Sequence, residues 1–233
     1  MKKIVRLAVS CSFIGLGACT TAQIAVPPNL AAGAEQLQIT GMGFGERGRF
    51  ALASSSGTFF RQALSSRHRD FRLSPERVTT FSGDSGFEVQ GPDFTGFVAA
   101  SCNHFEREAG TRTYSMTVAP FQYRCRFMRN GQLLPDELVL HVAPRAVGPL
   151  TGETRIGRVT IGGRQIDIEP IHHSPGLEIP TSEPLGYRFV SAGGDIGAVD
   201  LNGERKTIYA PRTSADREAV LMASLALSVL WKS

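Results

Sequence analysis

The chain has few cysteines, a single tryptophan and little excess of charge of one sign. Among its 233 residues are four cysteines, one tryptophan, 25 lysines and arginines, and 21 aspartates and glutamates. Beyond the N-terminus it lacks a run of about 18 or more apolar residues, which excludes a membrane-spanning helix there. Its length and its 42% of hydrophobic residues suffice for the core of one large domain.

The small excess of positive charge belongs to the start of the chain. Lys2, Lys3 and Arg6 precede an apolar run from Leu7 to Leu16, and this order is typical of an export signal. Without these three residues, 22 basic and 21 acidic residues remain. A nucleic acid is therefore not expected as a partner, because the chain lacks the basic excess that such a partner requires.

The export signal ends with Leu16-Gly17-Ala18-Cys19. This order resembles the lipobox of bacterial lipoproteins. The resemblance implies a signal peptide over residues 1–18, cleavage before Cys19, and acyl chains on the sulfur and the new amine of that residue. Thr20 follows rather than Asp, which in Gram-negative lipoproteins implies sorting to the outer membrane. We therefore expect the membrane to be a partner through acyl chains, on the periplasmic side.

Only two cysteines remain for the folded part of the chain. Cys11 leaves with the signal and Cys19 takes the lipid, so that Cys102 and Cys125 are left in a compartment where disulfides persist. We predict a disulfide between them. The alternative is a reactive or metal-binding pair, but the Cys-x-x-Cys spacing that such sites favour is absent.

Two parts are predicted after the signal peptide. Residues 19–36 are rich in alanine, contain Pro27-Pro28 and show no periodicity, which favours a lipidated, flexible tether. Residues 37–233 are expected to form a single globular, β-rich domain. No internal repeat divides them.

Strands are predicted from alternation of apolar and polar residues. Phe121, Tyr123, Cys125 and Phe127 alternate with polar residues, which places these four on a buried face. Asn130-Gly131 follows, a favoured type I′ hairpin turn. Further strands are expected at 49–53, 78–81, 87–90, 96–102, 138–142, 155–161, 164–168, 187–190, 196–201 and 206–209, and a short helix at 59–64.

One C-terminal helix is predicted over residues 214–231. Thr213-Ser214-Ala215-Asp216 has the form of a capping box, and the residues from Ala219 to Trp231 are almost all apolar. A helix that is apolar all round is buried, and about 13 residues are too few to cross a bilayer. The alternatives are a second membrane contact or an oligomer interface.

The predicted fold class is mainly β: an antiparallel curved sheet, sandwich or barrel with one buried C-terminal helix. The alternative is α+β. The segment Ile196–Gly203 with the following helix also resembles the C-terminal end of uncharacterised proteobacterial lipoproteins. That resemblance implies no activity.

His172 and His173 are the best metal-ligand candidates, with Glu169 and Glu178 nearby. Neighbouring side chains on a strand point to opposite faces, and the spacings His-x-x-x-His and His-Glu-x-x-His are absent. The simpler interpretation is a pair of exposed loop histidines. No metal, cofactor or catalytic residue is predicted.

Two glycine-containing segments resemble known motifs only in part. Gly83-Asp84-Ser85-Gly86 is similar to the nucleophile loop of chymotrypsin-like proteases, but Phe87-Glu88 follows where that family has Gly-Pro. A polar turn is expected there. Gly41-Met42-Gly43-Phe44-Gly45 lacks a phosphate-loop lysine and is interpreted as a bulged or bent strand.

The sequence therefore predicts a lipid-anchored envelope protein with a non-enzymatic binding or structural role, its partner being an envelope protein. One alternative is a carrier of a lipid or other hydrophobic ligand, which would need an unfilled apolar cavity. The second is a hydrolase without a recognisable local motif. It would need a converging set such as His172 with Glu169 in a cleft.

Overall fold

The computed structural model describes residues 23–43, 45–62, 65–70, 77–111, 113–143, 154–176, 178–212 and 216–230. The predicted signal peptide, Cys19 and the capping-box residues 213–215 lie outside these ranges. The elements are α1 (Pro28–Gly33), β1 (Glu35–Thr40), β2 (Arg47–Leu52), β3 (Ser55–Arg61), β4 (Ser65–Asp70), β5 (Arg77–Gln90), β6 (Val98–Gly110), β7 (Ser115–Arg129), β8 (Gln132–Val142), β9 (Arg155–Ile161), β10 (Arg164–Ile171), β11 (Gly186–Ser191), β12 (Gly194–Asp200), β13 (Lys206–Ala210) and α2 (Asp216–Ser228).

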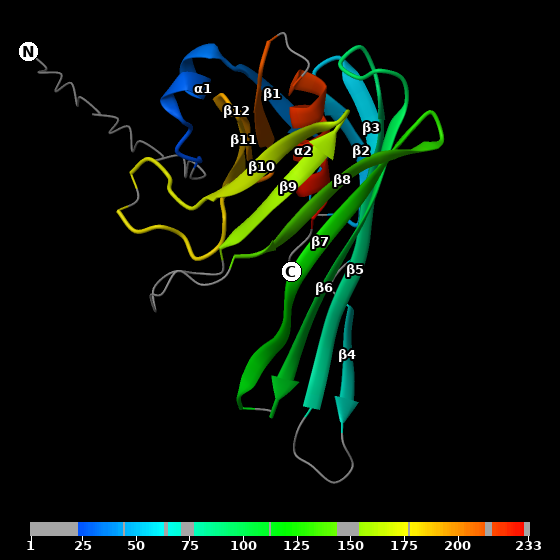
Figure 1. Cartoon of the computed structure of the whole chain (residues 1–233), viewed down its shortest axis with the longest axis vertical. Helices are drawn as coiled ribbons and strands as arrows, with labels where there is room; N and C mark the ends of the chain where they lie inside the picture. The colour runs from blue at the N-terminus through cyan, green and yellow to red at the C-terminus, as the bar shows by residue number, and fades with distance from the viewer. Residues whose placement is uncertain are drawn as a thin grey trace, which may run out of the picture.

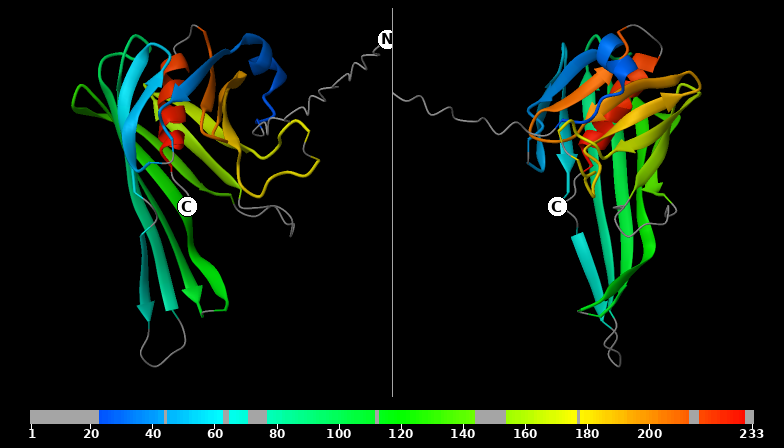
Figure 2. Two further views of the ribbon diagram at one scale, coloured as in Figure 1. Left: turned by 180° about the vertical axis from the view of Figure 1, so that it is seen from behind. Right: turned by 90° about the vertical axis from the view of Figure 1, so that its left-hand side faces the viewer.

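Twelve antiparallel strands form a closed barrel (Figure 1). The strands follow one another in the order β3-β2-β1-β13-β12-β11-β10-β9-β8-β7-β6-β5, and β5 pairs with β3 to close the ring. The first half of β5 pairs instead with β4. With β4 and parts of β6 and β7 it extends beyond the ring as an arm (Figure 2). The predicted fold class, mainly β with one C-terminal helix, is confirmed.

The alternation in β7 shows why these residues form the wall of a barrel. Phe121, Tyr123, Cys125 and Phe127 point inward and are at most 3% exposed, whereas the residues between them are exposed. Asn130-Gly131 makes the following turn with φ angles of 49° and 79°, as a type I′ turn requires. The predicted inward face and turn are confirmed.

Helix α2 occupies the interior of the barrel (Figures 1 and 2). Every residue from Ala219 to Val229 is at most 2% exposed, so the helix is buried on all sides as predicted. It lies inside a closed ring rather than across an open sheet. Its described bounds, 216–228, are shorter than the predicted 214–231, and residues 213–215 and 231 lie outside the described ranges.

Charged side chains fix the N-terminal end of α2 to the barrel rim. Arg217 donates to Glu35 at 2.6 Å and to Asp93 at 2.9 Å. Glu218 accepts from Arg129 at 2.8 Å. These pairs lie at the start of the helix. The acidic residues of this first turn also interact favourably with the positive end of the helix dipole.

No helix in the described ranges is both long and apolar enough to cross a membrane.

Residues 24–36 belong to the folded domain, so the predicted tether over 19–36 is wrong for this part. Ile24 is 2% exposed, Leu30 is 6% exposed, and β1 begins at Glu35. The apolar pair joins a second buried cluster on the outer wall, whose other buried members are Ile171, Ala198 and Tyr209. The composition of the segment is that of a linker, but its two large apolar residues find a surface made by distant strands.

Two predictions of local structure, a turn at residues 83–86 and a helix at residues 59–64, are also wrong. Gly83–Gly86 is no turn, because β5 runs unbroken from Arg77 to Gln90 and pairs with β6 throughout. A Cβ at Gly86 would meet the ring of Phe60 at 2.6 Å, so the glycine makes room for a neighbouring strand. Residues 59–61, predicted as helix, are the end of β3, because pairing with β2 and β5 outweighs local preference.

The disulfide between Cys102 and Cys125 is present, as predicted. The two residues are register partners on β6 and β7, and both are at most 2% exposed. The bridge therefore ties two neighbouring strands of the wall together inside the barrel.

Removing this bridge is expected to lower the free energy of unfolding by about 3 kcal/mol, because the unfolded chain regains the freedom of a closed loop. The variant is the double replacement Cys102→Ala and Cys125→Ala, measured by urea unfolding. The single Cys125→Ala variant serves as a control and should be destabilised to a similar degree. An unfolding midpoint equal to that of the unchanged chain would contradict the prediction.

Candidate functional site

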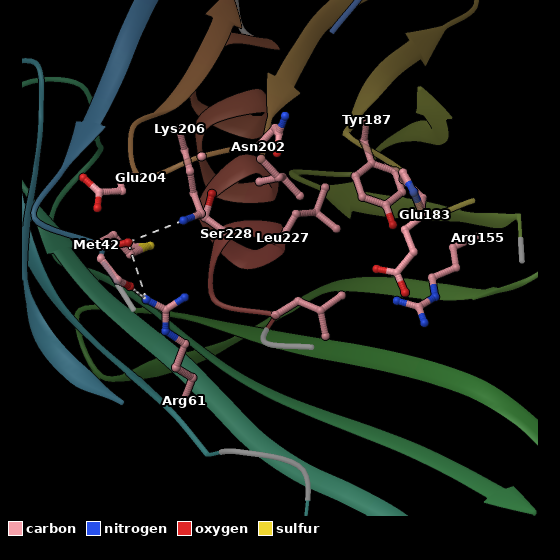
Figure 3. Close-up of a pocket in the computed structure, with 15 residues that line it drawn as sticks. Met42, Arg61, Arg155, Glu183, Tyr187, Asn202, Glu204, Lys206, Leu227 and Ser228 are labelled. Carbon is pink, nitrogen blue, oxygen red and sulfur yellow. Dashed lines mark hydrogen bonds between the residues drawn. The ribbon is translucent and has the colours of Figure 1, made fainter. Parts of the chain in front are cut away.

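A pocket of about 510 Å3 lies where α2 ends, at one end of the barrel (Figure 3). We call it the mouth pocket. Its lining includes Met42, Arg61, Arg155, Lys206, Leu227 and Leu230. Two further hollows, of about 510 and 760 Å3, lie on the outside of the barrel around β9 and β10. Only the mouth pocket among these three joins the charged residues Arg61 and Arg155, each at most 6% exposed, to the end of the central helix.

The floor of the mouth pocket is apolar. Leu227 and Leu230 come from the last turn of α2 and the residues directly after it, and Tyr187 and Leu201 line the pocket with them. These side chains lie here because α2 ends at Ser228, near this end of the ring, and the described residues leave a pocket next to its last turn. An apolar floor of this kind accommodates the hydrocarbon part of a ligand.

One end of the mouth pocket holds two cationic side chains. Lys206 and Arg61 both donate to the carbonyl oxygen of Met42, at 3.4 and 3.5 Å (Figure 3). Arg61 is only 6% exposed and also donates to the carbonyl oxygens of Gly43 and Gly45. We call Arg61 and Lys206 the cationic pair.

The glycine-rich segment at residues 41–45 supplies these carbonyl groups. It was predicted as a bulged strand, but Gly41–Gly43 and Gly45 belong to the loop that joins β1 to β2. Gly41 has a φ of 84°, and a Cβ there would lie 2.6 Å from the carbonyl oxygen of Arg49, so only glycine fits. Residue 44 lies outside the described ranges.

The two positive charges of the cationic pair repel each other, and both side chains are partly shielded from water. Burial lowers the pKa of Lys206, and the nearby charge of Arg61 lowers that pKa further. Burial also lowers the pKa of Arg61. A bound anion would stabilise both cations, because it restores the electrostatic solvation that burial removes.

The other end of the mouth pocket is closer to electrical balance. Arg155 lies over the ring of Phe121, with its guanidinium carbon 4.0 Å from the ring centre. The carboxylate of Glu183 points toward Arg155 in Figure 3. At the end of the cationic pair, two cations stand against the single carboxylate of Glu204, so the preference for an anion is greatest there.

Ser85 supports the central helix. The Tyr123 hydroxyl donates to the carbonyl oxygen of Ala226 at 2.7 Å, and the Oγ of Ser85 lies 3.4 Å from that hydroxyl. The carbonyl belongs to the last turn of α2, where the helix itself supplies no donor. Burial raises the pKa of Tyr123. Ser85, at 3% exposed, thus lies in a packed interior rather than in a nucleophile loop.

His104 is a second buried polar group near the mouth pocket. It is 4% exposed and stacks near Phe121, with 6.3 Å between ring centres. Burial lowers its pKa, and Arg155 lowers it further while Asp84 raises it. Within the described residues its Nε2 has no hydrogen-bond partner. Burial of the ring therefore favours the neutral form of the histidine.

The predicted metal-ligand candidates are not brought together. The Nδ1 of His172 lies 2.9 Å from the carbonyl oxygen of Thr181, and His173 is exposed. Glu169 pairs with Arg188. In the part of the chain that the structure describes, no three His, Cys, Asp or Glu side chains are grouped as metal ligands.

No family model, curated protein or solved structure matches this chain. Its function must therefore be inferred from its own residues.

The cationic pair was not found from the sequence, because its members come from β3 and β13 and form no local motif. One signal was present at Arg61. It follows Phe59 by two residues and shares its face, and its guanidinium carbon lies 4.8 Å from that ring centre. Charged side chains are rarely buried at core-facing positions of a strand, so a buried arginine indicates a specific role.

Proposed function

We propose that the protein is a lipid-anchored, non-enzymatic binding protein of the bacterial cell envelope. Its ligand is an amphipathic anion, with an apolar body and a carboxylate or phosphate head, held in the mouth pocket. The observation that carries the proposal is the cationic pair beside an apolar floor. Arg61 and Lys206 would hold the head, and Leu227 and Leu230 would contact the body.

Two observations support an envelope location. The lipobox-like order before Cys19 provides the attachment residue. The Cys102–Cys125 disulfide is typical of a protein that folds after export into an oxidising compartment. The packing of Ile24 then leaves only a short segment between the lipid and the barrel.

The position of the mouth pocket changes where a ligand would bind if the protein were a carrier of hydrophobic molecules. Helix α2 fills the barrel, and its residues from Ala219 to Val229 are at most 2% exposed, so a ligand would not lie between helix and sheet. The ligand would lie instead at the C-terminal end of the helix, in the mouth pocket. The set named for the hydrolase alternative is not assembled, because His172 and Glu169 bond to Thr181 and Arg188 rather than to each other.

The Lys206→Met variant is expected to bind dodecanoate at least about tenfold more weakly than the unchanged chain, since a hydrogen bond to a charged group contributes about 1.5–3 kcal/mol. Methionine keeps an unbranched side chain of similar shape, one heavy atom shorter, and removes the charge together with the hydrogen-bond donors of the ammonium group. Binding is measured by titration calorimetry on a lipid-free chain from Thr20, which retains every described residue.

The matched control is Arg124→Met, which removes one positive charge from a side chain 53% exposed on the barrel wall. It is expected to bind dodecanoate like the unchanged chain. Dodecyl maltoside, which carries the same apolar chain without charge, should bind both variants equally. Equal affinity of Lys206→Met and Arg124→Met for dodecanoate, or no binding to the unchanged chain, would refute the proposal.

A further inference from the structure

The N-terminal segment is held against one side of the barrel. The backbone N–H of Ile24 donates to Asp200 at 3.1 Å, and that of Ala25 donates to the carbonyl oxygen of His173 at 2.9 Å. The Ile24 side chain is 2% exposed. The chain therefore leaves the folded domain at a fixed place, beside residue 173.

This attachment limits how far the domain can lie from its lipid. Four residues lie between Cys19 and Ile24, which makes five steps along the chain. Even a fully extended segment of this length spans at most about 18 Å. A bilayer that holds acyl chains on Cys19 must therefore lie on the side of the barrel where Ile24 is packed.

A loop with an apolar tip lies on that same side. Residues 172–181, which we call the anchor-side loop, are closed at their base because Thr181 donates through its backbone N–H and its Oγ1 to the carbonyl oxygen of His172, at 2.9 and 3.0 Å. Near the tip, Ile179 is 80% exposed, more than any other large apolar side chain in the described ranges. Figures 1 and 2 both show the loop beside the start of the described chain.

The other strongly exposed apolar side chains lie elsewhere. Tyr114, Met116 and Val118, at 67%, 56% and 51% exposed, belong to the arm, and Leu133, at 63%, lies beside the turn between β7 and β8. Ile179 is thus the member of this group that stands where the lipid attachment requires the bilayer to be. An apolar side chain there would otherwise remain in water.

We propose that the anchor-side loop contacts the bilayer in which the acyl chains of Cys19 are inserted, with Ile179 entering the interface. The loop and the lipid together fix the orientation of the barrel on the membrane. Glu178 is exposed next to Ile179, and its negative charge disfavours contact with a strongly anionic surface. This inference rests on the lipid anchor of the proposed function.

The test compares two labelled positions in the acylated protein. Ile179→Cys and Leu133→Cys each place one environment-sensitive fluorophore on an exposed side chain, since Cys102 and Cys125 are joined in the disulfide. The proteins are reconstituted into phosphatidylcholine vesicles with and without brominated acyl chains. Fluorescence at position 179 is expected to be lost in the brominated vesicles, whereas fluorescence at position 133 is unchanged.

Flotation of the same vesicles separates two failures. If the protein floats with the vesicles but both labels respond alike, the loop contact is refuted while the lipid anchor stands. If the protein carries no acyl group and does not float, the anchor is refuted and the loop contact falls with it. Loss of fluorescence at position 179 alone, in floating vesicles, supports the contact.

Discussion

Leu225→Ala is expected to lower the free energy of unfolding by about 2–5 kcal/mol. Leu225 is fully buried in the middle of α2, and the helix is surrounded by a closed ring of strands. A ring whose strands are all paired cannot contract around the void that the truncated side chain leaves. The cost should therefore lie toward the upper part of that range. Urea unfolding followed by circular dichroism measures it.

Leu133→Ala is the matched control, because it removes the same atoms from a side chain that is 63% exposed. Its effect is expected to stay within about 0.5 kcal/mol. If the two variants unfold at the same urea concentration, α2 does not lie in the closed interior, and the position of the mouth pocket at its end is wrong as well.

The sequence predicted much of the barrel wall, because alternation depends on neighbouring residues, but it predicted no strand at β1 or β3. The strands at 155–161 and 164–168 and the buried face around Cys125 follow from which side chains lie inside and outside. Closure of the ring could not be predicted in this way. It depends on β5 leaving β4 after residue 82 and pairing with β3 from residue 85, and no local pattern marks that exchange.

The errors at Gly83–Gly86 and at residues 24–36 have a common physical cause. In both segments the local composition favours a turn or a linker, and in both the deciding partner is distant in the sequence. Phe60 packs over Gly86, and Ile24 joins Ala198 and Tyr209 on the outer wall. Composition describes what a segment prefers alone, whereas burial of apolar surface decides what it does in the fold.

The mouth pocket lay beyond sequence reasoning for a related reason. Its cationic pair, its apolar floor and the carbonyl groups that Arg61 contacts come from β3, β13, α2 and the loop between β1 and β2. A catalytic motif concentrates its residues within a few positions, but a binding pocket at the end of a barrel collects them from around the ring. The disulfide could be predicted because the resemblance to a lipobox assigns Cys11 and Cys19 other fates and leaves two cysteines to pair.

Cys19→Ala is expected to abolish acylation completely, because the proposed lipid anchor attaches through the sulfur and the amine of this residue. The measurement is the intact mass of the protein recovered from membranes. The unchanged chain should begin at Cys19 and carry two or three acyl chains, and each methylene buried in the bilayer then contributes about 0.8 kcal/mol to attachment. The variant should carry none.

Cys11→Ala is the matched control, because it removes the other N-terminal cysteine from a segment that the signal peptidase would discard. It should leave the mature mass, the acyl chains and flotation with membranes unchanged. A mature chain without acyl groups in the unchanged protein would refute the lipid anchor. The mouth pocket would still be open to test, since the lipid-free chain retains Arg61, Lys206 and α2 in full.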